Sequence, residues 1–353
     1  MIFLKKKIGG EPPNIFSYKC KLFLNLKEEQ KIYFCSSGRE AILKILKHEN
    51  INNVFIPNYY CYPVFSLIKN LKGIQLHGYS SQKELLSKIK KVDETKKKLI
   101  ILLFFNGMQE SLEEYEKFIN LDSKSIITIL DAAMTPFLTL SKFRFNYLIT
   151  NPRKFYRFPF GSLIFCNPDN KFRIIYNFNP IENIEYLFVK VFSRVLLNLR
   201  INFLERIGLI LNRYAEKKVP LKSDLFTNFF LKNLKFKDLR KIRIEQHNLY
   251  HQLLKPISNK FIFLKQASNE DCPFGFMIRL KNREKLVKFL SKERIFVSIL
   301  WQIPKYMIKD FDFATIKKTE EIVVFPIGPQ YSRKDIEKVC KLTLSFFKNE
   351  INL

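Results

Sequence analysis

The sequence predicts an α/β fold in which a large domain, built on a mostly parallel mixed sheet, is followed by a smaller α/β domain. Short, continuously apolar runs alternate with longer mixed segments between residues 31 and 165, and a similar alternation begins at residue 236. Strands that are apolar along their whole length are typical of parallel sheets covered on both faces. Because 353 residues is long for a single core, we expect domains at 1–235 and 236–353.

The first elements of the larger domain are expected to be a helix, a strand and a second helix. Ser36 or Ser37 can cap a helix over REAILKILKHE, because a serine hydroxyl accepts a hydrogen bond from a first-turn N–H group. The run VFIP at 54–57 predicts a strand. The segment PVFSLIKNLKG predicts a helix that begins at Pro63 and is closed by Gly73.

The same order continues toward the middle of the chain. The strand KLIILLFF ends at Phe105, a helix is expected from Ser111, and the strand SIITILD ends at Asp131. A further short strand, FNYLIT, precedes Asn151. Ligands of such sheets bind beyond the carboxyl ends of the strands. The loops after these strands are therefore the places where we expect a site.

Residues 182–217 form a different kind of segment, with apolar residues at every third or fourth position and basic residues between them. An amphipathic segment of this kind packs on its own protein or on a second subunit, or lies on an anionic membrane surface. Beyond residue 236 we expect helices over FKDLRKIRIEQHNLYHQLL, REKLVKFLSKE and SRKDIEKVCKLTLSFFKN, with strands over FGFMIRL and EIVVFPI between them.

The composition limits the classes of function and the cellular compartment. A formal charge of +28 suits anionic ligands, although the excess of Lys, Asn, Ile and Phe also fits a genome low in G and C. No basic stripe with interleaved aromatics is seen, which disfavours nucleic-acid binding. The six cysteines are scattered without metal-ligand spacing, so we expect reduced thiols and no metal. Without a signal peptide or an apolar run long enough to span a bilayer, the sequence indicates a soluble cytoplasmic protein.

Three of the expected loops carry groups that together can perform chemistry. Ser37, Gly38 and Arg39 begin a helix, where backbone N–H groups and the positive end of the dipole suit a phosphate. Asp131 ends a buried strand, where a carboxylate either caps the following turn or holds a ring nitrogen protonated. Lys154 lies in NPRKFYRFPFG, and a lysine desolvated near aromatics becomes a usable amine nucleophile.

An anchor for phosphate, a carboxylate for a ring nitrogen and a primary amine are the parts needed to hold pyridoxal phosphate. Each of them alone is common, and most lysines and strand-end aspartates have purely structural roles. Their occurrence in this chain order at one edge of one sheet favours pyridoxal phosphate over other cofactors.

The sequence also resembles the DegT/DnrJ/EryC1/StrS aminotransferases, fold type I enzymes that use pyridoxal phosphate. The resemblance rests on nine strings in order along most of the chain: IGGEPPN, CSSGREAI, VFIPNYYCYPVFSLIKNLKG, FFNGMQESLEE, LDAAMTPF, NYLITNPRKFYRFPFGSLIF, RIEQHNLYHQLL, CPFGFMIRLKNREKLVKFLSKERIFVSILW and VVFPIGPQYSRKDIEKVC. It implies a homodimer with the site at the subunit interface.

The resemblance assigns roles to the residues named above. It makes Lys154 the Schiff-base lysine and proton carrier and Asp131 the partner of the pyridinium nitrogen. It also places Ser37, Gly38 and Arg39 in the turn that binds the cofactor phosphate.

Other positions match the family less closely. One of Tyr59, Tyr60 and Tyr62 is expected to stack on the cofactor ring, and the sequence does not choose among them. Asn106 matches a turn near the cofactor, and Asn151 stands where a phosphate-binding serine is usual. Two further departures from the family pattern lie beside Asp131: Leu130 replaces the usual glutamate, and Met134 replaces a histidine or glutamine.

The activity that the resemblance implies is the transfer of an amino group from an amino acid, commonly glutamate, to a keto group. The acceptor would be a sugar nucleotide or another phosphorylated carbonyl, in the synthesis of cell-surface polysaccharide or amino sugars. A lyase or dehydratase on the same fold is an alternative, although such members tend to replace the lysine. A degenerate, non-catalytic member that acts as a partner or sensor is another, because of the departures at 130, 134 and 151.

Overall fold

The structure is a computed structural model of the chain. It describes residues 8–9, 31–108, 125–135, 145–155, 161–166, 170–173, 180–198, 202–217, 239–263 and 266–350. The expected helix from Ser111 and the boundary between residues 235 and 236 lie outside these ranges.

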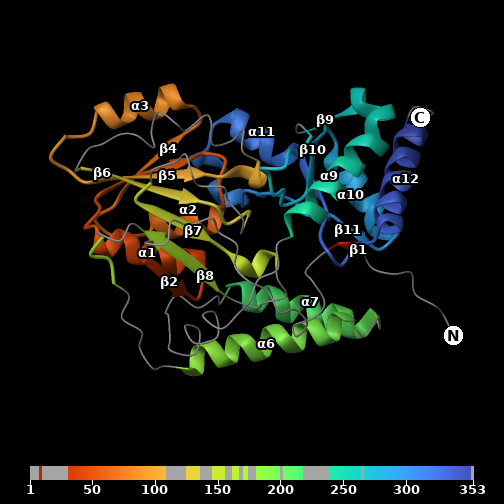
Figure 1. The fold of residues 1–353 in the computed structure, drawn as a ribbon, viewed down its shortest axis with the longest axis horizontal. Helices are drawn as coiled ribbons and strands as arrows, with labels where there is room; N and C mark the ends of the chain where they lie inside the picture. The colour runs from red at the N-terminus through yellow and green to blue at the C-terminus, as the bar shows by residue number, and fades with distance from the viewer. Residues whose placement is uncertain are drawn as a thin grey trace.

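The larger part of the molecule is built on a seven-stranded sheet with the strand order β2-β8-β7-β6-β5-β3-β4 (Figure 1). Only β8 runs antiparallel to its neighbours, and every other pair in this sheet is parallel. This confirms the predicted mostly parallel mixed sheet. The strands are Lys31–Cys35 (β2), Asn53–Pro57 (β3), Gln75–Tyr79 (β4), Lys98–Leu103 (β5), Ile126–Asp131 (β6), Tyr147–Thr150 (β7) and Ser162–Cys166 (β8).

Helices cover both faces of this sheet. Along β5, Leu99 and Ile101 pack in one apolar cluster with α1 (Gly38–His48) and α2 (Tyr62–Lys69). The alternate residues of the same strand pack in a second cluster, which includes Leu85 of α3 (Gln82–Lys90). Because successive side chains of a strand point to opposite faces, a continuously apolar strand is buried from both sides. Figure 1 shows α3 on one side of the sheet and α1 and α2 on the other.

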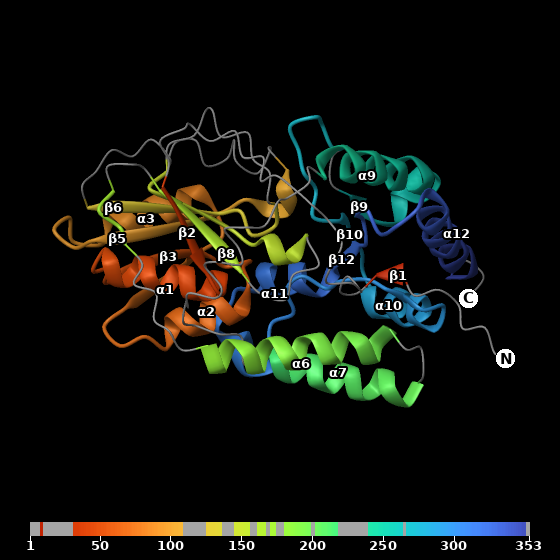
Figure 2. The same cartoon turned by 60° about the horizontal axis from the view of Figure 1, so that its bottom comes forward.

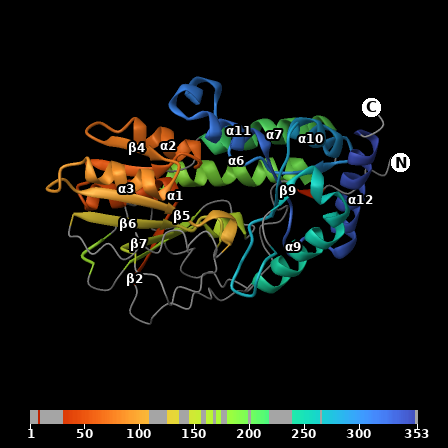
Figure 3. The same ribbon diagram turned by 90° about the horizontal axis from the view of Figure 1, so that it is seen from above.

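The C-terminal part has its own apolar core around a small antiparallel sheet with the order β12-β10-β9. In Figure 3 it lies beside the large sheet, with helices α9, α10 and α12 around it. Its strands are Ile262–Phe263 (β9), Phe276–Arg279 (β10) and Ile322–Phe325 (β12), and its helices are Arg240–Leu254 (α9), Arg283–Lys292 (α10), Phe313–Glu321 (α11) and Arg333–Glu350 (α12).

Two short elements from opposite ends of the chain pair with each other. β1 (Ile8–Gly9) lies parallel to β11 (Ile295–Phe296), and Ile8 is buried in the C-terminal core. Four 3₁₀ turns complete the described elements: Phe105–Gly107 (η1), Pro152–Lys154 (η2), Lys255–Lys260 (η3) and Lys305–Asp310 (η4).

The amphipathic segment expected at 182–217 forms two helices, α6 (Pro180–Asn198) and α7 (Asn202–Lys217), packed side by side. Figure 2 shows them as a separate layer along one side of the molecule. Their outer faces carry exposed apolar side chains, among them Phe188 at 68%, Phe203 at 69% and Ile210 at 66% exposure.

The structure departs from the sequence-based expectations at several elements. The strand β5 ends at Leu103, whereas the expected strand ended at Phe105. The helix α2 ends at Lys69, whereas Gly73, in a left-handed conformation with φ of 79°, lies four residues further along in the following turn. The strand β4 and the helix α3 were not predicted. None of the helices in the described ranges is long and apolar enough to cross a membrane. The described part of the chain also holds no group of His, Cys, Asp and Glu side chains able to bind a metal.

Candidate active site

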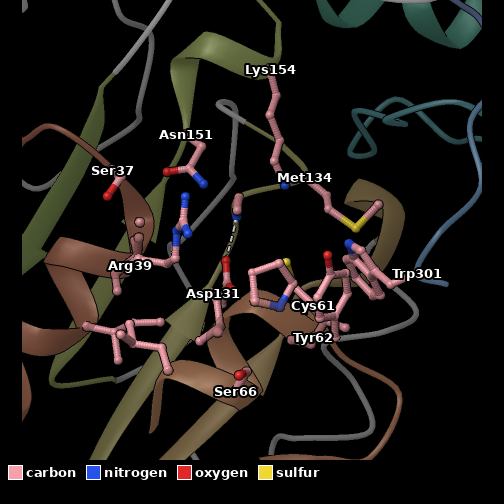
Figure 4. A pocket seen from close by; sticks show the side chains of 18 of the residues that line it. Ser37, Arg39, Cys61, Tyr62, Ser66, Asp131, Met134, Asn151, Lys154 and Trp301 are labelled. Atoms are coloured by element: carbon pink, nitrogen blue, oxygen red, sulfur yellow. Dashed lines mark hydrogen bonds between the residues drawn. The ribbon is translucent and has the colours of Figure 1, made fainter. Parts of the chain in front are cut away.

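A cavity of about 780 Å³ opens at the carboxyl ends of the parallel strands. Its walls come from the start of α1, the start of α2, the ends of β6 and β7, the turn η2, and Trp301. Ser37, Gly38, Arg39, Asp131, Asn151 and Lys154, which the sequence analysis singled out, all line it (Figure 4). The parallel topology brings these groups together, because it places the ends of successive strands at one edge.

Asp131 occupies the last position of β6, between β5 and β7, and only 7% of it is exposed. Its Oδ1 accepts a hydrogen bond of 2.8 Å from the N–H group of Ala133. Its Oδ2 accepts a hydrogen bond from the hydroxyl of Tyr60. A carboxylate oxygen has lone pairs for more than one donor, so Asp131 can still receive a hydrogen bond from a ligand in the cavity.

The start of α1 forms the opposite wall. Ser37 is the N-cap, and its Oγ accepts a hydrogen bond of 3.2 Å from the N–H group of Glu40. The carboxylate of Glu40 in turn accepts from the N–H group of Ser36 at 2.7 Å. These two reciprocal bonds fix the turn, so the first N–H groups of the helix and the side chain of Arg39 are presented at the cavity.

Asn151 lies directly above this helix start. A Cβ atom added at Gly38 would lie 3.0 Å from Asn151 Nδ2, so the glycine leaves the space that the amide fills. The Oδ1 of Asn151 is buried, and no residue in the described ranges supplies it with a hydrogen bond. Because buried polar atoms nearly always have partners, this amide group is poised for a ligand. The O and N atoms of an amide are exchangeable by rotation, so it can accept or donate.

Lys154 ends the turn η2, and its backbone N–H donates to the carbonyl of Asn151 at 3.1 Å. Its ammonium group lies 5.9 Å from the centre of the Phe274 ring. Figure 4 shows its side chain extended into the cavity toward Met134. The predicted neighbourhood of aromatics is therefore present, and Phe274 supplies it from the C-terminal part of the chain.

The pKa of Cys61 is influenced by three charged groups of the cavity. Burial raises the pKa of Cys61. The positive charges of Lys154 and Arg39 act against this shift, and the negative charge of Asp131 adds to it. All three predicted groups thus lie close enough to influence one thiol in the cavity wall.

The tyrosines of the segment 59–62 have three different environments. Tyr59 donates to the carbonyl of Leu300 at 2.7 Å and packs against Trp301. Tyr60 is buried beneath Asp131, and Tyr62 is the one whose side chain lines the cavity. Burial raises the pKa values of Tyr59 and Tyr60, so both hydroxyls stay protonated.

The predicted position Asn106 is placed elsewhere. It is fully buried in a left-handed conformation, and its side chain exchanges two hydrogen bonds of 3.2 Å with the backbone of Gly275. It therefore links the end of β5 to the C-terminal part of the chain and does not line the cavity. Of the two family departures beside Asp131, Leu130 packs in the core on the α3 face, and Met134 lines the cavity.

Several polar residues of the cavity wall were not found by sequence reasoning, among them Ser66, Asn70 and Asn212. Asn212 of α7 lines the outer wall, and its Oδ1 accepts a hydrogen bond of 2.5 Å from the ammonium group of Lys190 of α6. The unusual feature of the pair Lys190 and Asn212 is the complete burial of Lys190, which is visible only in the structure. A regular amphipathic pattern gives no sign of which polar residue faces a site.

Comparisons with known proteins identify the fold of this chain but not its family. No protein-family model matches the chain, and no curated protein matches it. Solved structures do match over most of its length. A DegT DnrJ EryC1 StrS aminotransferase from Brucella abortus superposes with a TM-score of 0.56 at 14% identity, covering 89% of this chain and 85% of that one.

Two further structures agree. The aminotransferase TlmJ from Streptoalloteichus hindustanus gives a TM-score of 0.59 at 10% identity, with coverage of 91% and 86%. The NtdA protein from Bacillus subtilis, solved with bound PMP, gives 0.58 at 12% identity, with coverage of 90% and 73%. This chain has the fold of the pyridoxal phosphate-dependent aminotransferases. The predicted fold type is confirmed.

The aminotransferase fold by itself does not decide the reaction. A NifS-like protein from Rickettsia africae also superposes, with a TM-score of 0.52 at 12% identity and coverage of 91% and 82%. Since one fold hosts different chemistries, the reaction has to be argued from the residues of the site.

Proposed function

We propose that this protein is a pyridoxal phosphate-dependent aminotransferase. The observation that carries the proposal is the convergence of Lys154, Asp131 and Asn151 with the start of α1 on one cavity. A lysine, a strand-end carboxylate and a phosphate cradle are widely used in proteins, but together they supply each contact that the cofactor needs.

The residues present fit the cofactor. Asn151 Oδ1 is buried, has no hydrogen-bond partner among the residues that the structure describes, and lies beside Gly38, where Ser37, Arg39 and the first N–H groups of α1 would hold the phosphate. Asp131 would accept a hydrogen bond from the protonated ring nitrogen. The aromatic rings of Tyr62 and Trp301, which line the cavity, are the candidates for contact with the ring. When bound, pyridoxal phosphate supplies an aldehyde for amines and an electron sink.

Lys154 has two tasks in this proposal. Its primary amine would hold the cofactor covalently, and the same amine would move a proton at the α-carbon of the amino donor. The ring of Phe274 lies 5.9 Å from this ammonium group and gives it an apolar neighbour. Asp131 would keep the ring nitrogen protonated, and this positive charge is the basis of the electron sink that the cofactor supplies.

We further propose that the amino donor is an amino acid, with glutamate the first to test, and that the acceptor is a keto group on a sugar nucleotide or another phosphorylated carbonyl. Support comes from two cations in the cavity wall, Arg39 and Arg153, since one phosphate of the cofactor does not require both. Synthesis of cell-surface polysaccharide or amino sugars in the cytoplasm is the setting we propose. The described cysteines form no disulfide with one another, which fits a reducing compartment.

We also propose a homodimer. Exposed apolar side chains gather on α6 and α7, including Phe188, Phe203 and Ile210, and contiguous exposed apolar patches mark interaction sites. A second copy of the chain would cover this face.

The proposed function is tested with purified protein and pyridoxal phosphate. We expect a visible absorption band, and after borohydride reduction a cofactor-labelled peptide that contains Lys154. The Lys154→Ala variant should bind the cofactor without the covalent label. In a separate, unreduced sample of the wild type, addition of glutamate should release 2-oxoglutarate. Absence of the band, or a label on another lysine, would refute the proposal, and a label without 2-oxoglutarate release would favour the lyase alternative or another donor.

A further inference from the structure

The hydrogen bond between Tyr60 and Asp131 joins a core residue to the cavity. The Tyr60 hydroxyl donates to Asp131 Oδ2, while the N–H group of Ala133 donates to Oδ1 at 2.8 Å. Each carboxylate oxygen therefore has one donor from the chain. Two donors on the two oxygens fix both the position and the plane of a carboxylate.

The environment of Tyr60 makes its hydroxyl a permanent donor. Its ring is 4% exposed, sits in the main apolar cluster and packs 6.2 Å from the ring of Trp301. Burial, followed by the charge and hydrogen bond of Asp131, keeps the pKa of Tyr60 well above its usual value. At any physiological pH the hydroxyl keeps its proton and serves Asp131 as a donor.

Packing alone would not need this hydroxyl. A phenylalanine would fill the same apolar space without a polar group to satisfy, and burial of an unpaired hydroxyl costs free energy. A buried carboxylate, in contrast, needs donors that compensate the loss of water. The pairing with Asp131 therefore explains why a tyrosine occupies this core position.

The other charged and titratable groups near this carboxylate lie on the cavity side. Lys154, Arg39 and Cys61 all line the cavity with Asp131. Tyr60 reaches it from the core beneath β6, and its ring is not among the cavity-lining groups. The side of Asp131 that faces the cavity is thus left for a ligand.

We propose that Tyr60 is a positioning residue that orients the Asp131 carboxylate toward a protonated ring nitrogen in the cavity. This role differs from stacking on the ring, which was one of the expectations for Tyr60. The inference rests on the proposed function, because it takes a protonated pyridine as the ligand.

The test is a double-mutant cycle with pyridoxamine 5′-phosphate, which binds without a covalent bond to lysine. Its dissociation constant is measured from the fluorescence of Trp301, the single tryptophan, which lines the cavity. Tyr60→Phe should weaken binding about tenfold, as expected for the loss of one hydrogen bond to a charged group. Asp131→Asn should weaken it further. In the Asp131→Asn background, Tyr60→Phe should have almost no effect, since the group it positions is gone.

The matched control is Tyr250→Phe, which removes another buried hydroxyl, one that donates to the carbonyl of Pro326 at 3.2 Å. It should leave the dissociation constant unchanged, and thermal unfolding without ligand checks that each variant is folded. Unchanged affinity in Tyr60→Phe, or equal losses in both backgrounds, would overturn the positioning role alone. If the wild type does not bind pyridoxamine phosphate, the proposed function fails as well.

Discussion

Lys190 is fully buried, and its ammonium group donates a hydrogen bond of 2.5 Å to Asn212 Oδ1. This bond crosses from α6 to α7 and ends at a residue of the cavity wall. Because Oδ1 of Asn212 accepts this hydrogen bond, the N–H₂ group of Asn212 points away from Lys190. The helical pair is thereby tied to the geometry of the candidate site.

Replacement of Asn212 alone should destabilise the fold more than replacement of Asn212 and Lys190 together. We expect Asn212→Leu to lower the free energy of unfolding by about 2 kcal/mol, since the buried cation loses an acceptor. The double variant Lys190→Met, Asn212→Leu should recover most of this loss. Urea unfolding measures both, with Lys292→Ala, an exposed lysine, as a control within about 0.5 kcal/mol of wild type. A double variant less stable than Asn212→Leu would contradict this account.

Gly38→Ala should affect ligand binding more than folding. The added methyl group would lie 3.0 Å from Asn151 Nδ2 and would displace the amide from the phosphate cradle. We expect the affinity for pyridoxal phosphate to fall about tenfold, equivalent to about 1.4 kcal/mol. The free energy of unfolding should change by no more than about 0.5 kcal/mol.

Gly73→Ala is the matched contrast. No atom of the described ranges lies within 4 Å of a Cβ added there, but φ is +79°. The left-handed conformation should cost about 1 kcal/mol in unfolding free energy and leave cofactor affinity unchanged. If both glycine variants lost affinity equally, the cradle assigned to Gly38 would be wrong.

Acid should destabilise the fold through His247. Burial lowers the pKa of His247 from 6.5 to about 4, and its Nε2 has no partner within the described residues. The unfolded chain therefore binds a proton between pH 6.5 and 4 that the folded chain does not, so stability falls as pH falls through this window. The loss should approach about 3 kcal/mol at pH 4.

The measurement is urea unfolding at pH 7 and pH 5. In His247→Gln the pH dependence of the unfolding free energy should be flatter than in the wild type, because the titrating group is absent. Equal slopes for the two proteins would show that other groups dominate the acid response.

The apolar face of α6 and α7 should decide the oligomeric state. We expect the wild type to be a dimer by light scattering and Phe203→Asp to be a monomer, since a charge cannot be buried without a partner. Ser291→Asp, at another exposed position, is the control and should stay dimeric. A monomeric wild type that floats with anionic vesicles would instead support membrane contact.

Features governed by local sequence were predictable. The cap at Ser37, the strand that ends at Asp131 and the strand over 54–57 all follow from short-range rules, and the structure confirms each of them. Parallel topology then placed the loops at one edge. For this reason Lys154, Asp131 and the helix start could be assigned to one site before the structure was known.

Features governed by tertiary context were not predictable. β4 was missed because QLHGY is a half-exposed strand at the edge of the sheet, without the continuous apolar run of its neighbours. The different environments of Tyr59, Tyr60 and Tyr62 depend on which ring lies under β6 and which faces the cavity. Asn212 enters the wall from a helix 58 residues beyond Lys154, and only the packing of α7 brings it there.

The parallel pairing of Ile8 with Ile295 limits when this part of the fold can form during synthesis. A ribosome adds about 5–20 residues per second, so the first of these residues is made at least about ten seconds, and up to about a minute, before its partner. The C-terminal core, which includes Ile8, cannot close until synthesis is nearly complete. Through most of translation, β1 is therefore present without β11, the strand with which it pairs.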